Sequence, residues 1–325
     1  MTDYRTTFNL QNSNEKISYF SKCLFIGSCF TENMGNFLHE MRFPVVVNPT
    51  GIIYNPYSIS QCIDFLINKR IFSDDDLIFY NEKYLSLLHH SRFSNPDKQV
   101  CLNKINTEME KASCFIKDAQ FLFITLGTSF VYYHKEKNGI VANCHKLPSA
   151  TFHKTLMSAA EITNNLSNAI LSLNKLNPQI KIIFTISPVR HWKEGAVNNQ
   201  LSKSTLLVAV HEIIKKFNNC IYFPAYELMM DDLRDYRFYA DDMIHPSTLA
   251  IEYIRDKFTS IFMENDTISL MNRIKKIVIA SQHKVFYSNT LEYQKFQQSF
   301  IKQIEEIEKE APYINLKQLK DLFFR

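Results

Sequence analysis

Short apolar runs of strand length alternate with longer amphipathic stretches along most of this 325-residue chain, and this alternation restricts the fold more than any other feature. Strand-like runs occur at 23–26, 44–47, 121–125, 181–186 and 221–223. Apolar residues follow the helical period at 31–41, 57–68, 161–173 and 202–217. Strands that alternate with helices form a parallel sheet with helices on both faces. The sequence therefore predicts an α/β fold built on a five-stranded parallel sheet.

In such a fold, the loops that leave the carboxyl ends of the strands form the ligand-binding crevice. In this chain those segments are 27–30, 48–55, 127–130, 187–192 and 242–245. We therefore expect the chemistry of the protein to lie in these five segments.

Two regions depart from the simple alternation. An Asn138-Gly139 pair separates the runs 130–133 and 140–143, a pattern typical of a β-hairpin. The tail is rich in Lys, Glu and Gln and mostly helical by period, for example at 296–308. We expect one domain over 1–264 and a helical extension over 265–325, which could be a cap, a coiled-coil-like arm or an oligomerisation element.

Composition excludes several classes of function. The net charge is +4, and 46% hydrophobic with 22% charged residues is ordinary globular usage. No dense Lys/Arg block occurs, so a nucleic-acid partner is not expected. No apolar run approaches the roughly 18 residues that span a bilayer, and the first residues lack the apolar core of a secretion signal.

Cysteine usage points to a reducing compartment. The count is seven, an odd number, and no CxxC pair occurs. We therefore expect free thiols and a cytoplasmic location. His89, His90 and His145 could be grouped with Cys144 as metal ligands, but their spacing matches no zinc pattern. Neither a metal nor a cofactor is expected.

The first strand-to-helix turn carries a candidate nucleophile. Gly27 ends the strand, and Ser28 and Cys29 follow it at the start of the helix. Amide groups and the dipole at a helix N-terminus favour an anion, so a cysteine there gains thiolate character. The same amides could donate to an oxyanion. The alternative is that Ser28 only caps the helix and Cys29 only packs.

A second candidate element lies near the end of the α/β region. Asp242 and His245 are three residues apart, and Pro246 and Ser247 follow before the next helix. A carboxylate next to a histidine can orient the ring and stabilise its protonated form. The nucleophile candidate and this pair stand at opposite ends of the α/β region, as the parts of a catalytic triad could.

These motifs together resemble the GSCFA-domain family, which is related to the SGNH/GDSL hydrolases. The resemblance covers roughly residues 5–290. It includes the segments 27–33, 48–56, 89–94, 125–128, 141–148, 187–191 and 235–246. One departure is Thr31, where the family motif has Ala. The resemblance implies an SGNH-like three-layer α/β/α fold and hydrolase or acyltransferase chemistry, without naming a substrate.

The resemblance leaves two candidates for the nucleophile. With Gly27 aligned on the Gly of the Gly-Asp-Ser motif, Cys29 takes the place of the nucleophilic Ser. By chemical type, Ser28 is the match. We favour Cys29, because position sets the geometry at a strand–helix turn. Asp242 and His245 then complete the triad.

An oxyanion hole is also implied by the resemblance. SGNH enzymes use the nucleophile's N–H, a Gly after the second strand and an Asn after the third. Gly51 fits the second role. The third strand is followed by Gly127, Thr128 and Ser129 without an Asn. Ser129 could replace it, or Asn143 could approach from the hairpin.

Further residues are candidates for substrate binding. Arg190 and His191 follow the fourth strand, and Arg190 could bind a carboxylate or a sugar acid, or instead hold a loop by a salt bridge. His90, His145 and Tyr54 complete the set.

We expect an enzyme that acts on an acyl ester, such as an acylated sugar or glycan. The alternatives are a binding module for an acylated sugar or peptide and a redox-sensing cysteine protein.

Overall fold

The five predicted strands form one parallel sheet in the computed structural model, which describes residues 6–283 and 290–324. The order across the sheet is β10-β9-β5-β1-β2. The strands are β1 (Cys23–Gly27), β2 (Val45–Val47), β5 (Phe121–Leu126), β9 (Lys181–Ile186) and β10 (Cys220–Tyr222). The predicted parallel α/β fold is therefore confirmed, with strand limits within one residue.

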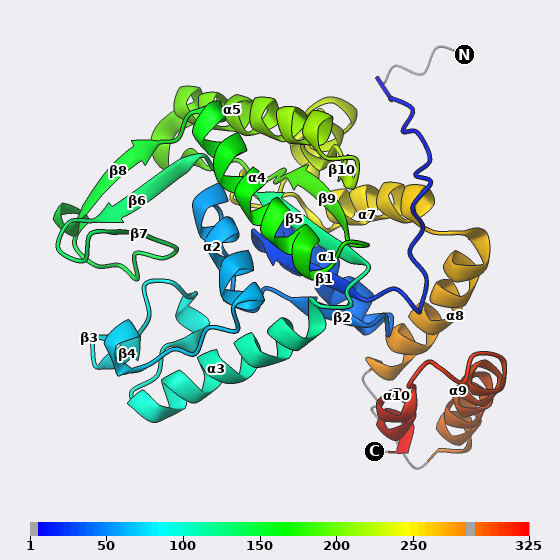
Figure 1. Ribbon diagram of the computed structural model, residues 1–325. Helices are drawn as coiled ribbons and strands as arrows, with labels where there is room; N and C mark the ends of the chain where they lie inside the picture. Colours follow the sequence, from blue (N-terminus) through cyan, green and yellow to red (C-terminus); the bar gives the residue numbers. More distant parts are fainter. Residues whose placement is uncertain (1–5, 284–289, 325) are drawn as a thin grey trace.

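Helices cover both faces of this sheet (Figure 1). Four of them share one apolar core: α2 (Pro56–Ile67), α3 (Lys98–Phe115), α4 (Ala159–Leu176) and α5 (Gly195–Lys216). On the other face lie α1 (Cys29–Glu40) and α7 (Thr248–Phe262). The structure is thus a three-layer α/β/α sandwich.

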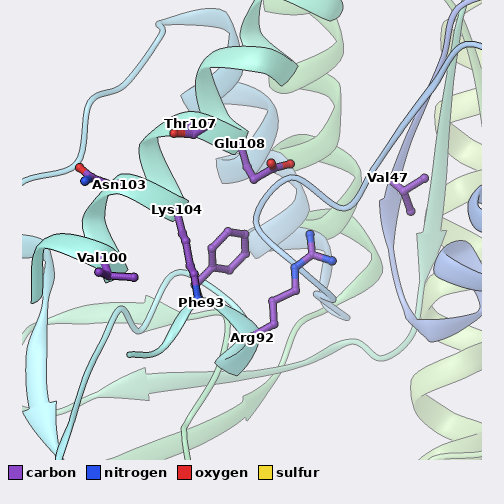
Figure 2. Close-up of a pocket in the computed structure, with 8 residues that line it drawn as sticks. All are labelled: Val47, Arg92, Phe93, Val100, Asn103, Lys104, Thr107 and Glu108. Atoms are coloured by element: carbon purple, nitrogen blue, oxygen red, sulfur yellow. The ribbon is translucent and has the colours of Figure 1, made fainter. Parts of the chain in front are cut away.

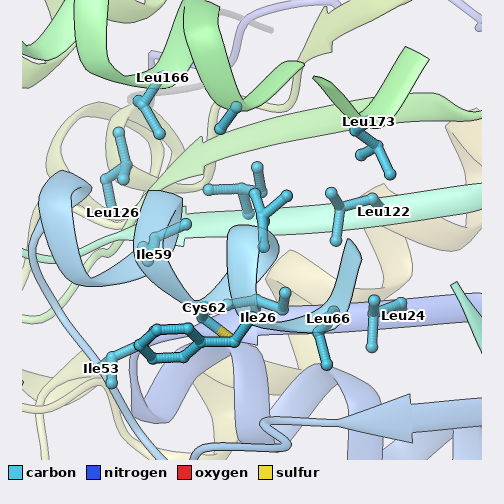
Figure 3. Packing of buried hydrophobic residues seen from close by; sticks show 14 of the residues in the cluster. Leu24, Ile26, Ile53, Ile59, Cys62, Leu66, Leu122, Leu126, Leu166 and Leu173 are labelled. Atoms are coloured by element: carbon cyan, nitrogen blue, oxygen red, sulfur yellow. The ribbon is translucent and has the colours of Figure 1, made fainter. Parts of the chain in front are cut away.

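Alternation within β1 explains why both faces are covered. Leu24 and Ile26 belong to the core under α2, and Cys23 and Phe25 belong to the core under α1. Successive residues of a strand point to opposite faces, so an unbroken apolar run requires cover on both. Figure 3 shows Leu24 and Ile26 among Ile59, Cys62 and Leu66 of α2.

Helices α1, α4 and α5 begin two or more residues earlier than their apolar period indicates. Helix α1 starts at Cys29 rather than at residue 31, because Ser28 caps it. Helix α5 starts at Gly195 rather than at residue 202. Its added turns bury Asn199, and its predicted part buries the polar Ser202 and Lys203, none of which hydrophobic periodicity can detect.

The predicted hairpin exists and carries a third strand. β6 (Phe130–His134) pairs with β7 (Gly139–Val141) as expected, and β8 (Phe152–Leu156) pairs antiparallel with the other edge of β6. A second hairpin, β3 (Ile78–Tyr80) with β4 (Lys83–Leu85), lies nearer to α3 (Figure 1). The β6–β7–β8 sheet stands at the carboxyl edge of the parallel sheet and forms a wall of the site.

The tail is helical, with α8 (Asn265–Ser281), α9 (Leu291–Glu310) and α10 (Lys317–Asp321). Part of the predicted extension, 284–289 and residue 325, lies outside the described residues. Ile304 and Ile307 of α9 are buried in the same cluster as residues of α1 and α7. A domain boundary after 264 and a role in oligomerisation stay predictions.

Within 6–283 and 290–324, no helix is both long enough and apolar enough to cross a bilayer.

Candidate functional site

A pocket of about 500 Å³ lies at the carboxyl edge of the parallel sheet. Its wall includes Ile244, beside the β9 and β1 loops and the β6–β7 hairpin. Eight of the predicted site residues line it: Cys29, Tyr54, Gly127, Thr128, Asn143, Arg190, His191 and His245. Segments that are more than 200 residues apart in the sequence therefore meet here, as the strand-end rule requires.

Gly27 forms the sharp turn that presents Cys29. Its φ is +148°, and a Cβ there would lie 2.3 Å from the carbonyl oxygen of Thr125 on the neighbouring strand. The Gly27 N–H donates to Asn48 Oδ1 at 2.9 Å. Only glycine tolerates both the positive φ and the close approach to Thr125, so the turn is fixed by close backbone packing.

The two nucleophile candidates have different surroundings. Ser28 is 1% exposed, and its Oγ accepts the Phe30 N–H at 3.3 Å as the N-cap of α1. Cys29 is partly exposed and lines the pocket. The turn thus commits the Ser28 hydroxyl to the helix and leaves the Cys29 thiol facing the cavity.

Several groups act on the Cys29 thiol. Burial raises its pKa. The backbone N–H groups of Phe30 and of Cys29 itself, together with the charge of Lys203, lower it, and Glu32 raises it. Desolvation is the largest of these influences, so the resting group is a thiol that needs a base to ionise.

Asp242 and His245 form a bonded pair at the mouth of the pocket. His245 Nδ1 lies 2.6 Å from Asp242 Oδ2. Asp242 Oδ1 also accepts the N–H groups of Ile244 and His245, both at 2.9 Å. These contacts, the His245 N–H first, lower the pKa of Asp242 to about 2, so this residue remains a carboxylate.

The loop after β9 anchors the turn that carries this pair. Arg190 N–H donates to the Ile244 carbonyl at 3.2 Å, and Ala240 N–H donates to the His245 carbonyl at 2.7 Å. Half of the His245 side chain is exposed. No hydrogen bond joins it to Cys29 in the described part of the chain, and catalytic contacts often tighten only when substrate binds.

The backbone N–H groups of the loop after β5 are hydrogen-bonded within the protein. The N–H groups of Gly127 and Thr128 both donate to the Tyr54 carbonyl, at 2.8 and 3.2 Å. Ser129 is fully buried, with its N–H and Oγ on Ser202 Oγ at 2.8 and 3.0 Å. Ser129 therefore faces α5 and does not line the pocket.

Gly51 and Asn143 differ in whether they keep a hydrogen-bond donor for a ligand. The Gly51 N–H donates to the Asn48 carbonyl at 2.7 Å, and Gly51 is outside the pocket lining. Asn143 lines the pocket and uses Oδ1 to accept the His145 N–H at 2.8 Å. Its Nδ2 amide has no hydrogen bond among the described residues, so it can serve a ligand.

Three histidines lie behind the pocket wall rather than in it. His90 caps the short helix Ser91–Phe93 through Nδ1. His145 Nε2 lies 2.8 Å from the Ser86 carbonyl and 3.0 Å from that of His89. Burial lowers the pKa of His89 to about 3. These contacts give the histidines structural roles. No metal-binding cluster of His, Cys, Asp or Glu occurs in 6–283 and 290–324.

Cations dominate the charge of the pocket. Arg190 and Lys193 line it, and no Asp or Glu does. The Arg190 guanidinium lies 5.6 Å from the Trp192 ring, and its Nε is buried without a hydrogen-bond partner in the described structure. Partial desolvation, followed by three lysine charges, lowers the pKa of His191.

Several residues of the site were absent from the sequence prediction. Asn55 lines the pocket while its Oδ1 caps α2 by accepting the Ser58 N–H. Ser202 bonds the loop after β5, and Asn199 Oδ1 accepts the His191 N–H at 2.8 Å. Lys203 is 1% exposed. Asn199, Ser202 and Lys203 are spaced so that they form a polar stripe along one face of a helix. This spacing is the sequence signal that could have identified them.

A second cavity, of about 670 Å³, lies between α3 and β2 (Figure 2). Arg92, Lys104 and Glu108 line it, and none of the predicted site residues does. It holds no pairing of a nucleophile with a base.

Comparison with solved structures gives distant likenesses. A carbohydrate esterase family 3 protein from Talaromyces cellulolyticus is 9% identical over 79% of this chain and 99% of its own, with a TM-score of 0.37. A putative acylhydrolase from Bacteroides fragilis is 11% identical over 81% and 91%, with a TM-score of 0.36.

An acetyl xylan esterase from Butyrivibrio proteoclasticus is 10% identical over 75% of this chain and 64% of its own, with a TM-score of 0.39. Likenesses at this level carry no argument about function. A search of curated proteins found no match.

Family profiles give a firmer result. The GSCFA family profile matches residues 22–258, and the profile of the C-terminal domain of GSCFA domain proteins matches 274–324. The first match includes the β1–α1 turn and the Asp242–His245 pair. The chain belongs to the GSCFA family.

Proposed function

We propose that this protein is an acyl hydrolase or acyltransferase that forms a covalent acyl-enzyme on Cys29. The observation that carries the proposal is the meeting of Cys29, at a helix N-terminus, and His245 in one pocket. The Asp242 carboxylate holds His245 from beside the pocket lining. This is the arrangement of nucleophile, base and orienting group used in acyl transfer.

The tautomer of His245 follows from its partner. Asp242 accepts a hydrogen bond from Nδ1–H, which leaves Nε2 free to accept the Cys29 proton. The sulfur then bonds to the acyl carbon, and the carbonyl electrons move to oxygen. Collapse of this intermediate expels the alcohol, which takes the proton from His245. Water or an acceptor hydroxyl then cleaves the thioester with the same base. This cycle requires no cofactor.

The developing oxyanion needs donors that are not already bonded. The Nδ2 of Asn143 meets this condition. The N–H of Cys29, at the first position of α1, contacts its own sulfur, and we propose it as the second donor once the sulfur has bonded to the acyl carbon. Asn55 adds a second side-chain amide whose Oδ1 is engaged. Gly51 does not, because its N–H is bonded to Asn48. Asn143 therefore keeps the role of the Asn after the third strand, and Asn55 takes the place that the resemblance gave to Gly51.

The pocket suits a substrate with an anionic group. Arg190 supplies a guanidinium whose buried Nε has no hydrogen-bond partner among the residues that the structure describes, and Trp192 and Tyr132 supply aromatic walls. Aromatic walls with a few fixed polar groups are typical of ligand pockets, and a guanidinium binds carboxylates in a bidentate way. We propose an acylated sugar or glycan that carries such an acid.

The test is intact-protein mass spectrometry after brief exposure to p-nitrophenyl acetate, followed by peptide mapping. We expect one acetyl group, on the peptide that contains Ser28 and Cys29. We also expect the adduct to be lost in His245→Ala and retained in His39→Ala, which removes an exposed histidine at the far end of α1. Adducts that appear equally in both variants would contradict the proposal.

A binding module is the second candidate. The engaged amides of Gly51, Gly127 and Thr128 favour it, because a hydrolase profits from free donors. On this view the pocket holds an acylated sugar or peptide without turnover. Tight binding of such a ligand without an acyl-enzyme, at any substrate concentration, would select this function.

A further inference from the structure

Lys203 is a charged side chain in a place where charges are rarely found. It lies on α5, one residue after Ser202, and is 1% exposed. Its Nζ donates to the Ser187 carbonyl at 2.8 Å. Within the described residues no carboxylate lies within ion-pair distance of it. Burying an ammonium without a counter-charge is strongly unfavourable, so this position needs an explanation.

The surroundings of Lys203 point toward the pocket. Ser187, which accepts its hydrogen bond, lines the same pocket as Cys29. The Tyr226 ring lies 5.7 Å from Nζ on another side. Lys203 therefore stands directly behind the wall that separates α5 from the nucleophile.

Two titratable groups, Cys29 and Arg190, influence the charge of Lys203 besides burial. Burial lowers its pKa to about 7. Cys29 raises that pKa and Arg190 lowers it, and Lys203 in turn lowers the pKa of His191. Of these, only Cys29 can present a negative charge to it. The coupling is reciprocal, because Lys203 lowers the pKa of Cys29.

We propose that Lys203 is a positioning residue whose buried positive charge stabilises the thiolate of Cys29. The missing counter-charge is then the sulfur anion itself, formed when the thiol loses its proton. In a site of low dielectric such an interaction is stronger than at the surface. The proposal rests on Cys29 as the nucleophile of the proposed function.

The first test measures the rate at which iodoacetamide alkylates Cys29 as a function of pH, by peptide mass mapping and without substrate. Cys114, an exposed free thiol, is the internal reference in every sample. In Lys203→Met we expect the Cys29 profile to move to higher pH by about one unit, with about tenfold slower alkylation at pH 7.5. The Cys114 rate should not change.

Lys193→Met is the matched control, because Lys193 is an exposed lysine that lines the same pocket. We expect a shift well below that of Lys203→Met, since solvent screens its charge. A Cys29 profile that is the same in wild type and a folded Lys203→Met would overturn the proposal.

A second measurement removes the dependence on that variant folding. The ¹³Cε signals of labelled lysines are followed by pH titration in the wild type and in Cys29→Ala. We expect one lysine to titrate far below the rest, and its midpoint to fall further when the thiol is absent. An unchanged midpoint would overturn the proposal. Because neither experiment uses substrate, a failure to detect an acyl-enzyme would count against the proposed function alone.

Discussion

The two ends of the pocket handle charge in opposite ways. At the mouth, Asp242 and His245 are each about half exposed and are paired at 2.6 Å. At the buried end, behind the pocket wall, Lys203 is almost fully enclosed and has no carboxylate partner in the described structure. The exposed pair can exchange protons with solvent and substrate. The buried lysine lies away from solvent and substrate, and in our proposal it acts through its field on Cys29.

This difference suggests a division of labour along the pocket. Proton transfer is assigned to the end where water is available, and charge stabilisation to the end where the dielectric is low. Electrostatic interactions are worth most in such enclosed regions. The predictions below test each end, starting with the largest expected effect.

Cys29→Ala should abolish the acyl-enzyme, because no sulfur remains to form the bond. We expect at least a 1,000-fold loss of p-nitrophenyl acetate turnover, on the order of the loss when a catalytic nucleophile is removed. Burst kinetics measure it, with Cys62→Ala, a buried thiol on α2, as the control. Retained turnover in Cys29→Ala would assign the chemistry elsewhere.

His245→Ala should cost about 10²–10⁴-fold in the acylation rate, which is typical for loss of a general base. Asp242→Asn should cost less at neutral pH, because the ring remains and the amide oxygen can still accept the backbone N–H groups. Single-turnover rates at saturating ester compare the two. If Asp242→Asn were the more damaging variant, the carboxylate would have a role beyond orienting the ring.

The pH dependence of the rate should also show whether Asp242 or another group produces any acidic limb. Since the pKa of Asp242 is about 2, this group stays ionised across the working range, and any acidic limb of the rate profile above pH 4 belongs to another group. In Asp242→Asn that limb should persist. Its disappearance would show that Asp242 itself titrates there.

Lys203→Met should stabilise the fold while slowing the chemistry. Burial lowers the pKa of Lys203 from 10.5 to about 7, so the native state binds fewer protons than the unfolded chain between these values. Its contribution to stability therefore falls as pH falls from about 10.5 to 7. The gain in Tm of Lys203→Met should be larger at pH 7 than at pH 10. A loss of Tm at both would mean that the lysine is chiefly structural.

Ser28→Ala should have the smallest effect on activity. Its hydroxyl caps α1, so we expect a loss of about 1 kcal/mol in the free energy of unfolding. Urea denaturation measures it, with Ser247→Ala, the cap of α7, as a matched control. Acylation should stay within about threefold of wild type. A complete loss of acylation in a folded Ser28→Ala would favour Ser28 as the nucleophile.

The sequence predicted the scaffold well because the two kinds of signal, apolar runs and turn residues, are local. Apolar runs such as 181–186 read directly as strands, and the Asn138-Gly139 turn specified the β6–β7 hairpin. The meeting of Cys29 and His245 in one pocket followed from the strand-end rule.

The remaining features depend on contacts that spacing does not record. Whether the Gly51 N–H is free depends on the turn that returns it to Asn48. Ser129 faces away from the pocket because Ser202 of α5 meets it. Lys203 was missed because a lysine in a helix is ordinarily solvated, and only the structure shows α5 lying over the ends of β5 and β9.

The most direct test of the central claim identifies the atom that carries the acyl group. The protein is mixed with p-nitrophenyl acetate, quenched in acid and mapped, and half of the sample is treated with neutral hydroxylamine before analysis. A thioester on Cys29 is predicted, so the acetyl group on the 28–29 peptide should be removed by hydroxylamine and absent in His245→Ala. A hydroxylamine-resistant acetyl group on Ser28, or no site-specific adduct at all, would contradict the account.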